Sequence, residues 1–287
     1  MTFDYSEAFS RNIGWVTPQE QEKLRAATIA IAGNGGVGGF HALTLARLGI
    51  GALRLSDLDD FEVANFNRQI GATMATVGRP KVEVIAEMAK QINPELEIEI
   101  FPQGVHRENG EEFLNGVDVY VDGLDYFAVQ ARRSIFDFCH RLSIPAVTAA
   151  PLGMGAAVLS FLPGKMSFEQ YFRLDGVSEQ EQLVRFLLGL SPRMLQRNYL
   201  VWPEAVDFDA HKGPSTGMAC AVCAGMASTE VLKIVLNRGK VVAAPWGVQF
   251  DAYRCKFVKT WRPGGNRNPL QRIALAIATR QLANMKK

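Results

Sequence analysis

The stretch TIAIAGNGGVGGFHALTLARLGI, residues 28–50, decides the fold class of this chain. Its apolar start, Thr28–Ala32, predicts a buried strand, and its periodic end, Val37–Leu48, predicts a helix. The turn between them contains G-x-G-x-x-G, a pattern that lets the backbone approach a phosphate and aims a helix N-terminus at it. The candidate phosphate-binding residues are Gly33, Gly35, Gly36 and Gly38. The stretch predicts a nucleotide-binding turn without choosing between a nicotinamide dinucleotide and ATP.

Strand and helix patterns alternate through the first half of the chain. Strands are predicted at 28–32, 52–56, 96–101, 117–121 and 145–150, and helices at 37–48, 79–91 and 127–141. Such alternation is typical of βαβ units and a parallel sheet. We therefore expect an α/β fold with a doubly wound, Rossmann-like, mostly parallel sheet.

The pattern changes after Pro151. A strand is expected within AAVLSFLP, and residues 165–214 then form a long crossover insertion, with a helical piece near 179–188. Insertions of this length are usually lids or binding segments. A buried helix at Met218–Leu236 and an antiparallel C-terminal extension (248–251 and 257–261) complete the sheet, before a tail helix at about 270–285.

We expect one domain that carries an insertion. Its parts are an N-terminal segment contacting a dimer partner (1–26), a nucleotide-binding domain (27–164), a crossover or substrate segment (165–214), a helix and strands completing the domain (215–263), and a C-terminal tail helix (264–287).

Charge and composition narrow the cellular setting. The 287 residues carry a formal net charge of +2, so no global charge favours nucleic acid or an anionic membrane. The start, MTFDYSEAFSR, lacks the pattern of a signal peptide, and no uninterrupted apolar run reaches the roughly 18 residues of a membrane span. The four cysteines are few and unevenly spaced, which disfavours a disulfide framework. We expect a cytoplasmic protein with no membrane span.

Asp57 follows the second predicted strand, where dinucleotide-binding folds place an acid on the ribose hydroxyls. NAD and ATP both carry that ribose, so Asp57 does not separate the two either. The choice depends on residues that perform chemistry.

Four further segments carry such residues, and they occur in a fixed order: DLDDFEVANFNRQI (57–70), TVGRPKVE (76–83), INPELEIEI (92–100) and VDVYVDGLDYFAVQARR (117–133). This order resembles the ThiF/MoeB/HesA superfamily, adenylating enzymes related to ubiquitin-activating enzymes. The resemblance is dense from about Phe9 to Pro151 and returns near Pro214–Asp251. It implies an ATP-dependent adenylyltransferase that acts on a carboxylate, commonly the C-terminal glycine of a ubiquitin-like protein.

The resemblance also implies roles for single residues. Arg68 and Lys81 are implied to bind the ATP phosphates, with Asn65 beside Arg68. Asp125 is implied to hold Mg²⁺, with Asp59 in support. A further residue, Arg11 in FSRNIG, is implied to reach the active site of the neighbouring subunit of a homodimer.

Physical chemistry supports the same residue types. Attack of a carboxylate on an α-phosphate joins two anions and expels pyrophosphate. The site therefore needs cations on the phosphates and a metal held by a carboxylate. Arginine is well suited to this task because its planar guanidinium contacts phosphate with two hydrogen bonds.

Two alternatives stay open for the function. An NAD(P)-dependent oxidoreductase explains the glycine turn and Asp57 but leaves Arg68, Lys81 and Asp125 without a role. A non-catalytic relative would act only as a binding or dimer partner. The substrate also stays open between a ubiquitin-like or sulfur-carrier C-terminus, a peptide, and a carboxyl group on a tRNA base. The near-neutral charge disfavours nucleic acid, although a balanced chain can still carry a basic face.

Cys220 and Cys223 form the only CxxC pair of the sequence. Relatives with a structural zinc carry two such pairs, so we expect no structural zinc here. Both cysteines lie in the predicted buried helix, where we expect them to act as small apolar residues. The crossover has no cysteine, so we expect adenylation without a catalytic cysteine; Cys220 is the nearest candidate.

The remaining expectations concern the second half of the chain. Most aromatic residues of the crossover, in FEQYF (168–172) and at Tyr199 and Trp202, are expected in the core. His211 and Lys212 are expected in a polar turn. The tail helix is expected to pack on the partner subunit rather than on a membrane surface.

Overall fold

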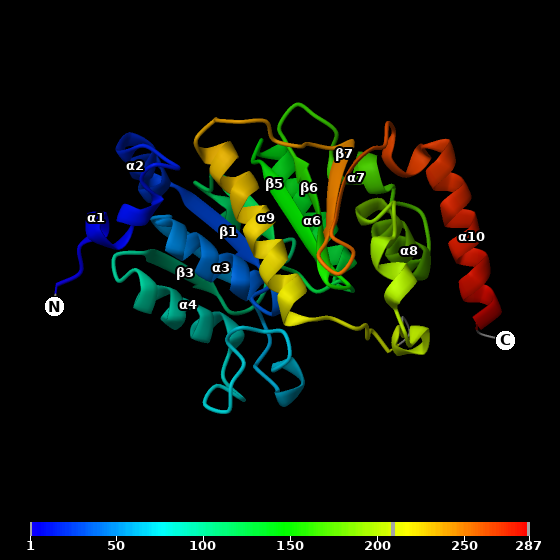
Figure 1. The fold of residues 1–287 in the computed structure, drawn as a ribbon, viewed down its shortest axis with the longest axis horizontal. Helices are drawn as coiled ribbons and strands as arrows, with labels where there is room; N and C mark the ends of the chain where they lie inside the picture. The colour runs from blue at the N-terminus through cyan, green and yellow to red at the C-terminus, as the bar shows by residue number, and fades with distance from the viewer. Residues whose placement is uncertain (1, 208–209, 286–287) are drawn as a thin grey trace.

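An eight-stranded sheet with helices on both faces forms the centre of the structure (Figure 1). The computed structural model describes residues 2–207 and 210–285, with side chains described as far as residue 280. The strand order is β3-β2-β1-β4-β5-β6-β7-β8. The strands from β3 to β5 pair in parallel, and those from β5 to β8 pair antiparallel. The predicted α/β fold with an antiparallel extension is confirmed.

The strands cover β1 Thr28–Ala32, β2 Ala52–Ser56, β3 Glu97–Phe101, β4 Val119–Asp122, β5 Ala146–Leu152, β6 Gly155–Phe161, β7 Trp246–Asp251 and β8 Lys256–Trp261. The α-helices cover α1 Tyr5–Ala8, α2 Pro18–Ala26, α3 Gly36–Leu48, α4 Lys81–Ile92, α5 Gly110–Leu114, α6 Val129–Arg141, α7 Phe168–Phe172, α8 Glu179–Leu190, α9 Gly217–Val235 and α10 Pro269–Met285. Short 3-10 helices are η1 Ser10–Asn12, η2 Val63–Asn65, η3 Leu195–Tyr199, η4 Pro203–Ala205 and η5 Gly265–Arg267.

The sheet separates two apolar cores, and β1 shows how one strand serves both. Ile29 and Ile31 lie in the core that α3, α4 and α9 cover, whereas Ala30 and Ala32 lie in the core that α6, α7 and α8 cover. This split follows from the alternation of side chains along a strand. Because both faces of the sheet are covered, the sequence of a central strand such as β1 is a continuous apolar run and does not alternate between apolar and polar residues.

Helix α9 packs against α3 and against strands β5 and β6, across one face of the sheet (Figure 1). Within the described residues it is the one helix long and apolar enough to cross a membrane by length and composition. Its apolar character is explained by packing, since Cys220 and Cys223 are fully buried in the core beside α3. These two cysteines are therefore core residues, as expected from the sequence.

The crossover contains more structure than its sequence pattern indicates. Short α7 begins with a capping box, in which Ser167 and Gln170 bond reciprocally to each other's backbone N–H groups. Phe168, Tyr171 and Phe172 are buried, which confirms the expected core role of the FEQYF aromatics, whereas Trp202 is exposed.

Helix α10 packs against α8 and η5 of its own chain, so the tail helix has an intramolecular partner. Its apolar side chains Leu270, Ile273 and Ile277 remain exposed. Packing of this helix on a partner subunit stays a prediction. The N-terminal helix α1 lies at the opposite end of the molecule from α10 (Figure 1).

Candidate functional site

The glycine turn lies at the carboxyl end of β1, pressed against the turn that follows β4. Gly33 has φ of +82°, and a Cβ there would lie 2.3 Å from the carbonyl oxygen of Gly123. A Cβ at Gly38 would lie 1.6 Å from the carbonyl oxygen of Gly33. Only glycine fits either position, because the opposing atoms are backbone. The close packing fixes the turn between two strands.

Helix α3 starts at this turn without a side-chain cap. Its N-cap is Gly35, which has no side chain to accept from the first-turn N–H groups. Uncapped N–H groups at a helix N-terminus form a site for an anion. This geometry is compatible with an anion at the turn, and phosphate binding there stays a prediction.

Asp57 holds the same turn from the end of β2. Its Oδ2 accepts from the N–H of Asn34, and its Oδ1 accepts from the N–H of Asp59 at 2.9 Å. Burial raises the pKa of Asp57, against the lowering effect of these two hydrogen bonds and of Lys81. Asp57 therefore lies beside the glycine turn, at the position predicted for a ribose-binding acid.

Lys81 and Asp59 form an ion pair beside Asp57. The Nζ of Lys81 lies 2.9 Å from Oδ2 of Asp59, and the lysine is 7% exposed although it opens helix α4. A surface lysine with no role would extend into water. The burial of Lys81 instead keeps its charge at the edge of the sheet where the glycine turn lies.

The NRQ segment (67–69) joins the glycine turn to the start of α9. Asn67 donates from Nδ2 to the carbonyl of Ser215 at 2.9 Å, and Arg68 donates from Nη1 to Asn67 Oδ1 at 3.0 Å. The side chain of Gln69 lies 3.3 Å from the place where a Cβ of Gly35 would stand. Arg68 is partly exposed, so its guanidinium is accessible at this edge.

Asn65 and Cys220 have structural surroundings of their own. The Oδ1 of Asn65 accepts from the N–H of Glu62 at 2.9 Å and so closes a 3-10 turn. A Cβ at Gly36 would lie 3.3 Å from Sγ of Cys220, whose thiol pKa is raised by burial. A role for Asn65 on the nucleotide stays a prediction.

Asp125 is exposed just beyond β4. Its Oδ1 accepts from the N–H of Phe127 at 2.9 Å, and the ring of Phe127 stacks on His211 of the crossover at 4.8 Å. Within the described residues, no group of three or more His, Cys, Asp or Glu side chains could hold a metal ion. Magnesium is commonly held by one or two carboxylates together with substrate phosphates, and Asp125 fits that pattern.

A buried network supports Asp125, and the sequence analysis missed it. Asp122 Oδ2 accepts from Arg132 Nε and from Thr148 Oγ1, each at 2.7 Å. The Nη2 of Arg132 donates to the carbonyls of Leu124 and Asp125, at 2.6 and 3.1 Å. Arg132 therefore ties the loop that carries Asp125 to the centre of the sheet. The available signal was the first aspartate of VDGLD, Asp122, followed by arginine on the next helix.

Arg11 lies at the other end of helix α3 from the glycine turn. It belongs to η1, where neighbouring Asn12 donates from Nδ2 to the carbonyl of Leu48. Helix α3 has 13 residues, which corresponds to a length of about 20 Å at roughly 1.5 Å per residue. The fold thus keeps Arg11 away from the site of its own chain, and its action on a partner's site stays a prediction.

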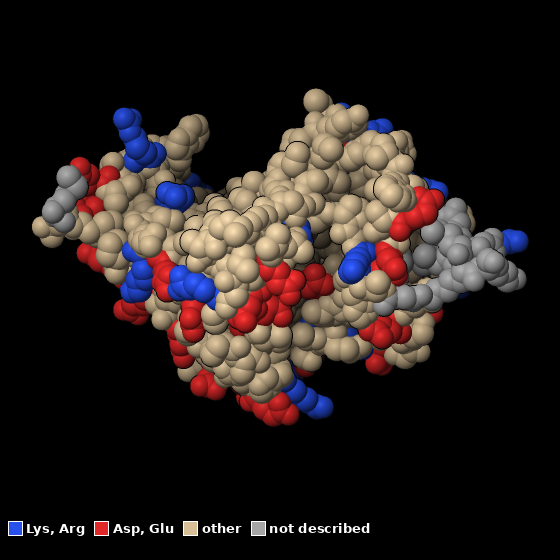
Figure 2. All heavy atoms as spheres, turned by 90° about the horizontal axis from the view of Figure 1, so that it is seen from below, with Lys and Arg blue, Asp and Glu red and all other residues tan. Residues whose placement is uncertain are grey.

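The face drawn in Figure 2 mixes acidic and basic side chains and does not form one continuous basic surface.

The candidate site brings the residues described above together at one edge of the sheet. An uncapped helix N-terminus, the acid Asp57, the Lys81–Asp59 pair, Arg68 and Asp125 come from the ends of β1, β2 and β4 and from the segments that follow them. This arrangement can hold a nucleotide with its phosphates at the glycine turn and a metal ion near Asp125.

Comparisons with known proteins identify relatives of this chain in sequence and in fold. The chain is 38% identical over 151 residues to the tRNA threonylcarbamoyladenosine dehydratase of Haemophilus influenzae, which covers 52% of this chain and 57% of that one. It is 29% identical over 244 residues to the sulfur carrier protein adenylyltransferase of Thermus thermophilus, covering 85% and 82%. The crystal structure of the Escherichia coli tRNA N6-threonylcarbamoyladenosine dehydratase TcdA in complex with AMP has a similar fold. Its TM-score is 0.60 at 24% identity, covering 81% of this chain and 95% of that one.

The chain spans a little over half the length of three tRNA threonylcarbamoyladenosine dehydratases that it matches in sequence. The family model, in contrast, matches residues 9–272, which include every strand and the whole candidate site. The glycine turn, the ordered motifs behind it and this match together assign the chain: it belongs to the ThiF family.

Proposed function

We propose that this chain uses ATP to adenylate a carboxylate, with release of pyrophosphate, and that it does so as a cytoplasmic homodimer. The observation that carries the proposal is the meeting of the uncapped α3 N-terminus with buried Lys81 and exposed Asp125 at one sheet edge. A nicotinamide enzyme has no need of this cation and this acid. The TcdA relative has been seen with AMP, the nucleotide part of an adenylate.

The residues divide the work by their chemistry. The glycine turn and the first turn of α3 would bind the phosphates, and Asp57 would accept from the ribose hydroxyls. Lys81 and Arg68 would neutralise the charge that builds up on the phosphates, together with Arg11 of the partner subunit. Asp125 would hold Mg²⁺, which as a Lewis acid polarises the phosphate oxygens.

In the proposed reaction, a carboxylate oxygen attacks the α-phosphorus of ATP. The bond between that phosphorus and the bridging oxygen breaks, and pyrophosphate leaves with the electron pair. The product is a mixed anhydride of the carboxylate and AMP. Residues 165–214 would select the carboxylate, because the crossover reaches the Asp125 loop through the stacking of His211 on Phe127. The division into an N-terminal dimer segment (1–26), a nucleotide-binding part (27–164), a completing part (215–263) and a tail (264–287) belongs to the same proposal.

Calorimetric titration tests this proposal directly. The pure protein is titrated with ATP with and without Mg²⁺, and separately with NAD and NADP. Asp125→Asn keeps the oxygen that accepts from Phe127 N–H and is expected to lose the magnesium dependence of ATP binding. The matched control is Asp137→Asn, an exposed carboxylate on helix α6. Binding of NAD without binding of ATP would favour the oxidoreductase alternative.

Catalysis needs a second assay. ATP–pyrophosphate exchange is measured with candidate carboxylates: a sulfur-carrier protein, a peptide precursor and tRNA carrying a carboxylated base. Lys81→Met is expected to lower the rate by about 10² to 10³, the usual cost of one electrostatic contact in a transition state. If ATP binds but no candidate supports exchange, the non-catalytic alternative gains support.

A further inference from the structure

Helix α8 of the crossover contacts the Asp125 loop, residues 123–128, through the side chain of Tyr126. The Tyr126 hydroxyl donates to the carbonyl of Leu183 in α8 at 2.5 Å, although 57 positions separate the two residues in the chain. The centroid of the Tyr126 ring lies 5.6 Å from that of Phe186, in the same helix. The residue that follows Asp125 is therefore held by the crossover as well as by its own strand.

The same helix also contacts the arginine that supports this loop. The centroid of the Phe186 ring lies 4.6 Å from the guanidinium carbon of Arg132. That guanidinium donates to the carbonyls of Leu124, Asp125 and Tyr126. Arg132 thus fixes the backbone of the Asp125 loop, and α8 packs on both the loop and its support.

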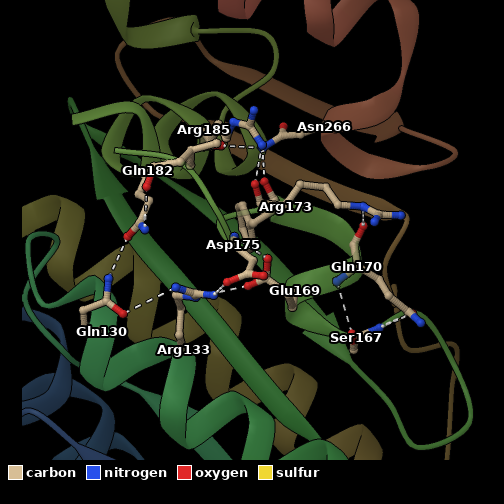
Figure 3. Close-up of polar contacts among 12 residues, drawn as sticks. Gln130, Arg133, Ser167, Glu169, Gln170, Arg173, Asp175, Gln182, Arg185 and Asn266 are labelled. Atoms are coloured by element: carbon tan, nitrogen blue, oxygen red, sulfur yellow. Dashed lines mark hydrogen bonds and ion pairs between the residues drawn. The ribbon is translucent and has the colours of Figure 1, made fainter. Parts of the chain in front are cut away.

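Polar contacts fix the crossover on helix α6, which follows the Asp125 loop in the chain (Figure 3). The Nε2 of Gln130 donates to Oε1 of Gln182 in α8 at 2.8 Å. Arg133, also on α6, contacts two carboxylates of the crossover at 3.1 and 3.2 Å, those of Glu169 and Asp175. Because Gln182 and Leu183 are adjacent, α8 is bound to α6 and to the Asp125 loop at neighbouring residues.

The contacts of Tyr126 join two segments with different roles in the proposed function, since residues 165–214 would select the carboxylate and Asp125 would hold Mg²⁺. We propose that Tyr126 is a positioning residue for Asp125, through which the crossover sets the geometry of the metal site. Magnesium requires nearly ideal octahedral coordination, so a small displacement of one carboxylate weakens its binding. This role rests on the proposed function, because it applies only if Asp125 holds the metal ion.

Calorimetric titration with ATP at a series of Mg²⁺ concentrations tests the role. Tyr126→Phe removes the hydroxyl that α8 holds and keeps the ring. The variant is expected to need about fivefold more Mg²⁺ for the same strengthening of ATP binding, a size typical of coupling through packed side chains and hydrogen bonds. Binding of ATP without Mg²⁺ is expected to match wild type, because the glycine turn is unchanged.

The matched control is Tyr171→Phe. Tyr171 is a buried tyrosine of the crossover, and its hydroxyl also donates to a backbone carbonyl, that of Gly189 at 3.0 Å. Both variants therefore lose the same kind of hydrogen bond, and urea unfolding curves should show similar losses of stability. Tyr171→Phe should nevertheless keep the wild-type magnesium dependence, because Tyr171 makes no contact with the Asp125 loop among the contacts of the described residues.

Hydrogen exchange adds a measurement that needs neither ATP nor Mg²⁺. The N–H of Phe127 donates to Oδ1 of Asp125, so its exchange rate reports how firmly the carboxylate is held. The rate is expected to rise about fivefold in Tyr126→Phe and to stay at the wild-type value in Tyr171→Phe.

The outcomes separate this role from the proposed function. Wild-type magnesium dependence and wild-type Phe127 exchange in Tyr126→Phe, or equal changes in the two variants, would overturn the role of Tyr126 and leave adenylation untouched. Magnesium-dependent ATP binding with no pyrophosphate exchange for any carboxylate would count against adenylation alone. ATP binding by the wild-type protein that does not depend on Mg²⁺ would refute the metal role of Asp125 and, with it, that of Tyr126.

Discussion

Replacing Arg132 by methionine should strongly destabilise the protein. The change keeps much of the side-chain volume but removes the positive charge from a pair in which both side chains are almost fully buried. Asp122 would keep three donors, the Thr148 hydroxyl, the Leu124 N–H and the more distant Tyr120 hydroxyl. Its negative charge would nevertheless have no counterion at the centre of the sheet.

The expected loss is about 3 to 5 kcal/mol, the usual cost of removing one partner of a buried ion pair. The hydrogen bonds to the carbonyls of Leu124 and Asp125 are lost as well. The contact of the Arg132 guanidinium with the Phe186 ring, whose centroid lies 4.6 Å from the guanidinium carbon, is lost too. A domain with a total stability of about 5 to 15 kcal/mol can still fold after this loss, but with much reduced resistance to denaturant.

Urea unfolding followed by circular dichroism measures the effect. The matched control is Arg141→Met on the same helix, whose partners Glu111 and Asp137 are exposed. An exposed pair contributes at most about 1 kcal/mol, so this control should unfold close to wild type. The double variant Asp122→Leu, Arg132→Met removes both charges and should recover part of the lost stability. A loss below about 1 kcal/mol for Arg132→Met, or one equal to that of the control, would refute the reasoning.

Two further predictions concern helix α3, which lies on the opposite face of the sheet from α6. Burial lowers the pKa of His41 from 6.5 to about 3, and neither ring nitrogen has a hydrogen-bond partner. Folded His41 is therefore neutral while unfolded His41 binds a proton, so stability should fall as pH decreases from about 6.5 toward 3, by up to about 1.4 kcal/mol per pH unit. In His41→Leu this part of the pH dependence should vanish, as urea midpoints at neutral and acidic pH would show; an unchanged acid slope would contradict the assignment. Gly38→Ala should abolish ATP binding in calorimetry, because its Cβ would overlap the Gly33 carbonyl. Gly225→Ala, in α9 with open space around the new Cβ, should bind ATP normally and gain up to about 1 kcal/mol of stability; equal behaviour of the two variants would count against the glycine turn as the site.

The alternating half of the fold was predictable because its strands are buried on both faces. Strands such as Thr28–Ala32 and Ala52–Ser56 were predicted to the residue, since glycines or charged residues end each apolar run sharply. The short helices α1, α2, α5 and α7 were missed because one or two turns give too little periodicity to recognise. Helix α2 nevertheless had a start signal in the sequence. Thr17 and Glu20 have the spacing of a capping box, and Pro18 is the first residue of the helix.

The candidate site was predictable where single motifs carry it and unpredictable where distant segments meet. The glycine turn and Asp57 come from adjacent elements, so their proximity follows from one βαβ unit. The placement of Arg132 against Asp122 and Thr148 requires the pairing of β4 with β5, which no local pattern specifies.

The antiparallel pairing of β6 with β7 has a consequence for how new specificities arise. These two strands are neighbours in the sheet, although the whole crossover and helix α9 lie between Phe161 and Trp246. For a flexible connection, doubling its length costs only about 0.6 kcal/mol of closure entropy. The irregular parts of the crossover can therefore change in length during evolution at little cost, whereas α7 and α8 are constrained because they cover one core of the sheet. The irregular loops of the crossover, rather than α7 and α8, are therefore the part to exchange in an attempt to engineer a new substrate.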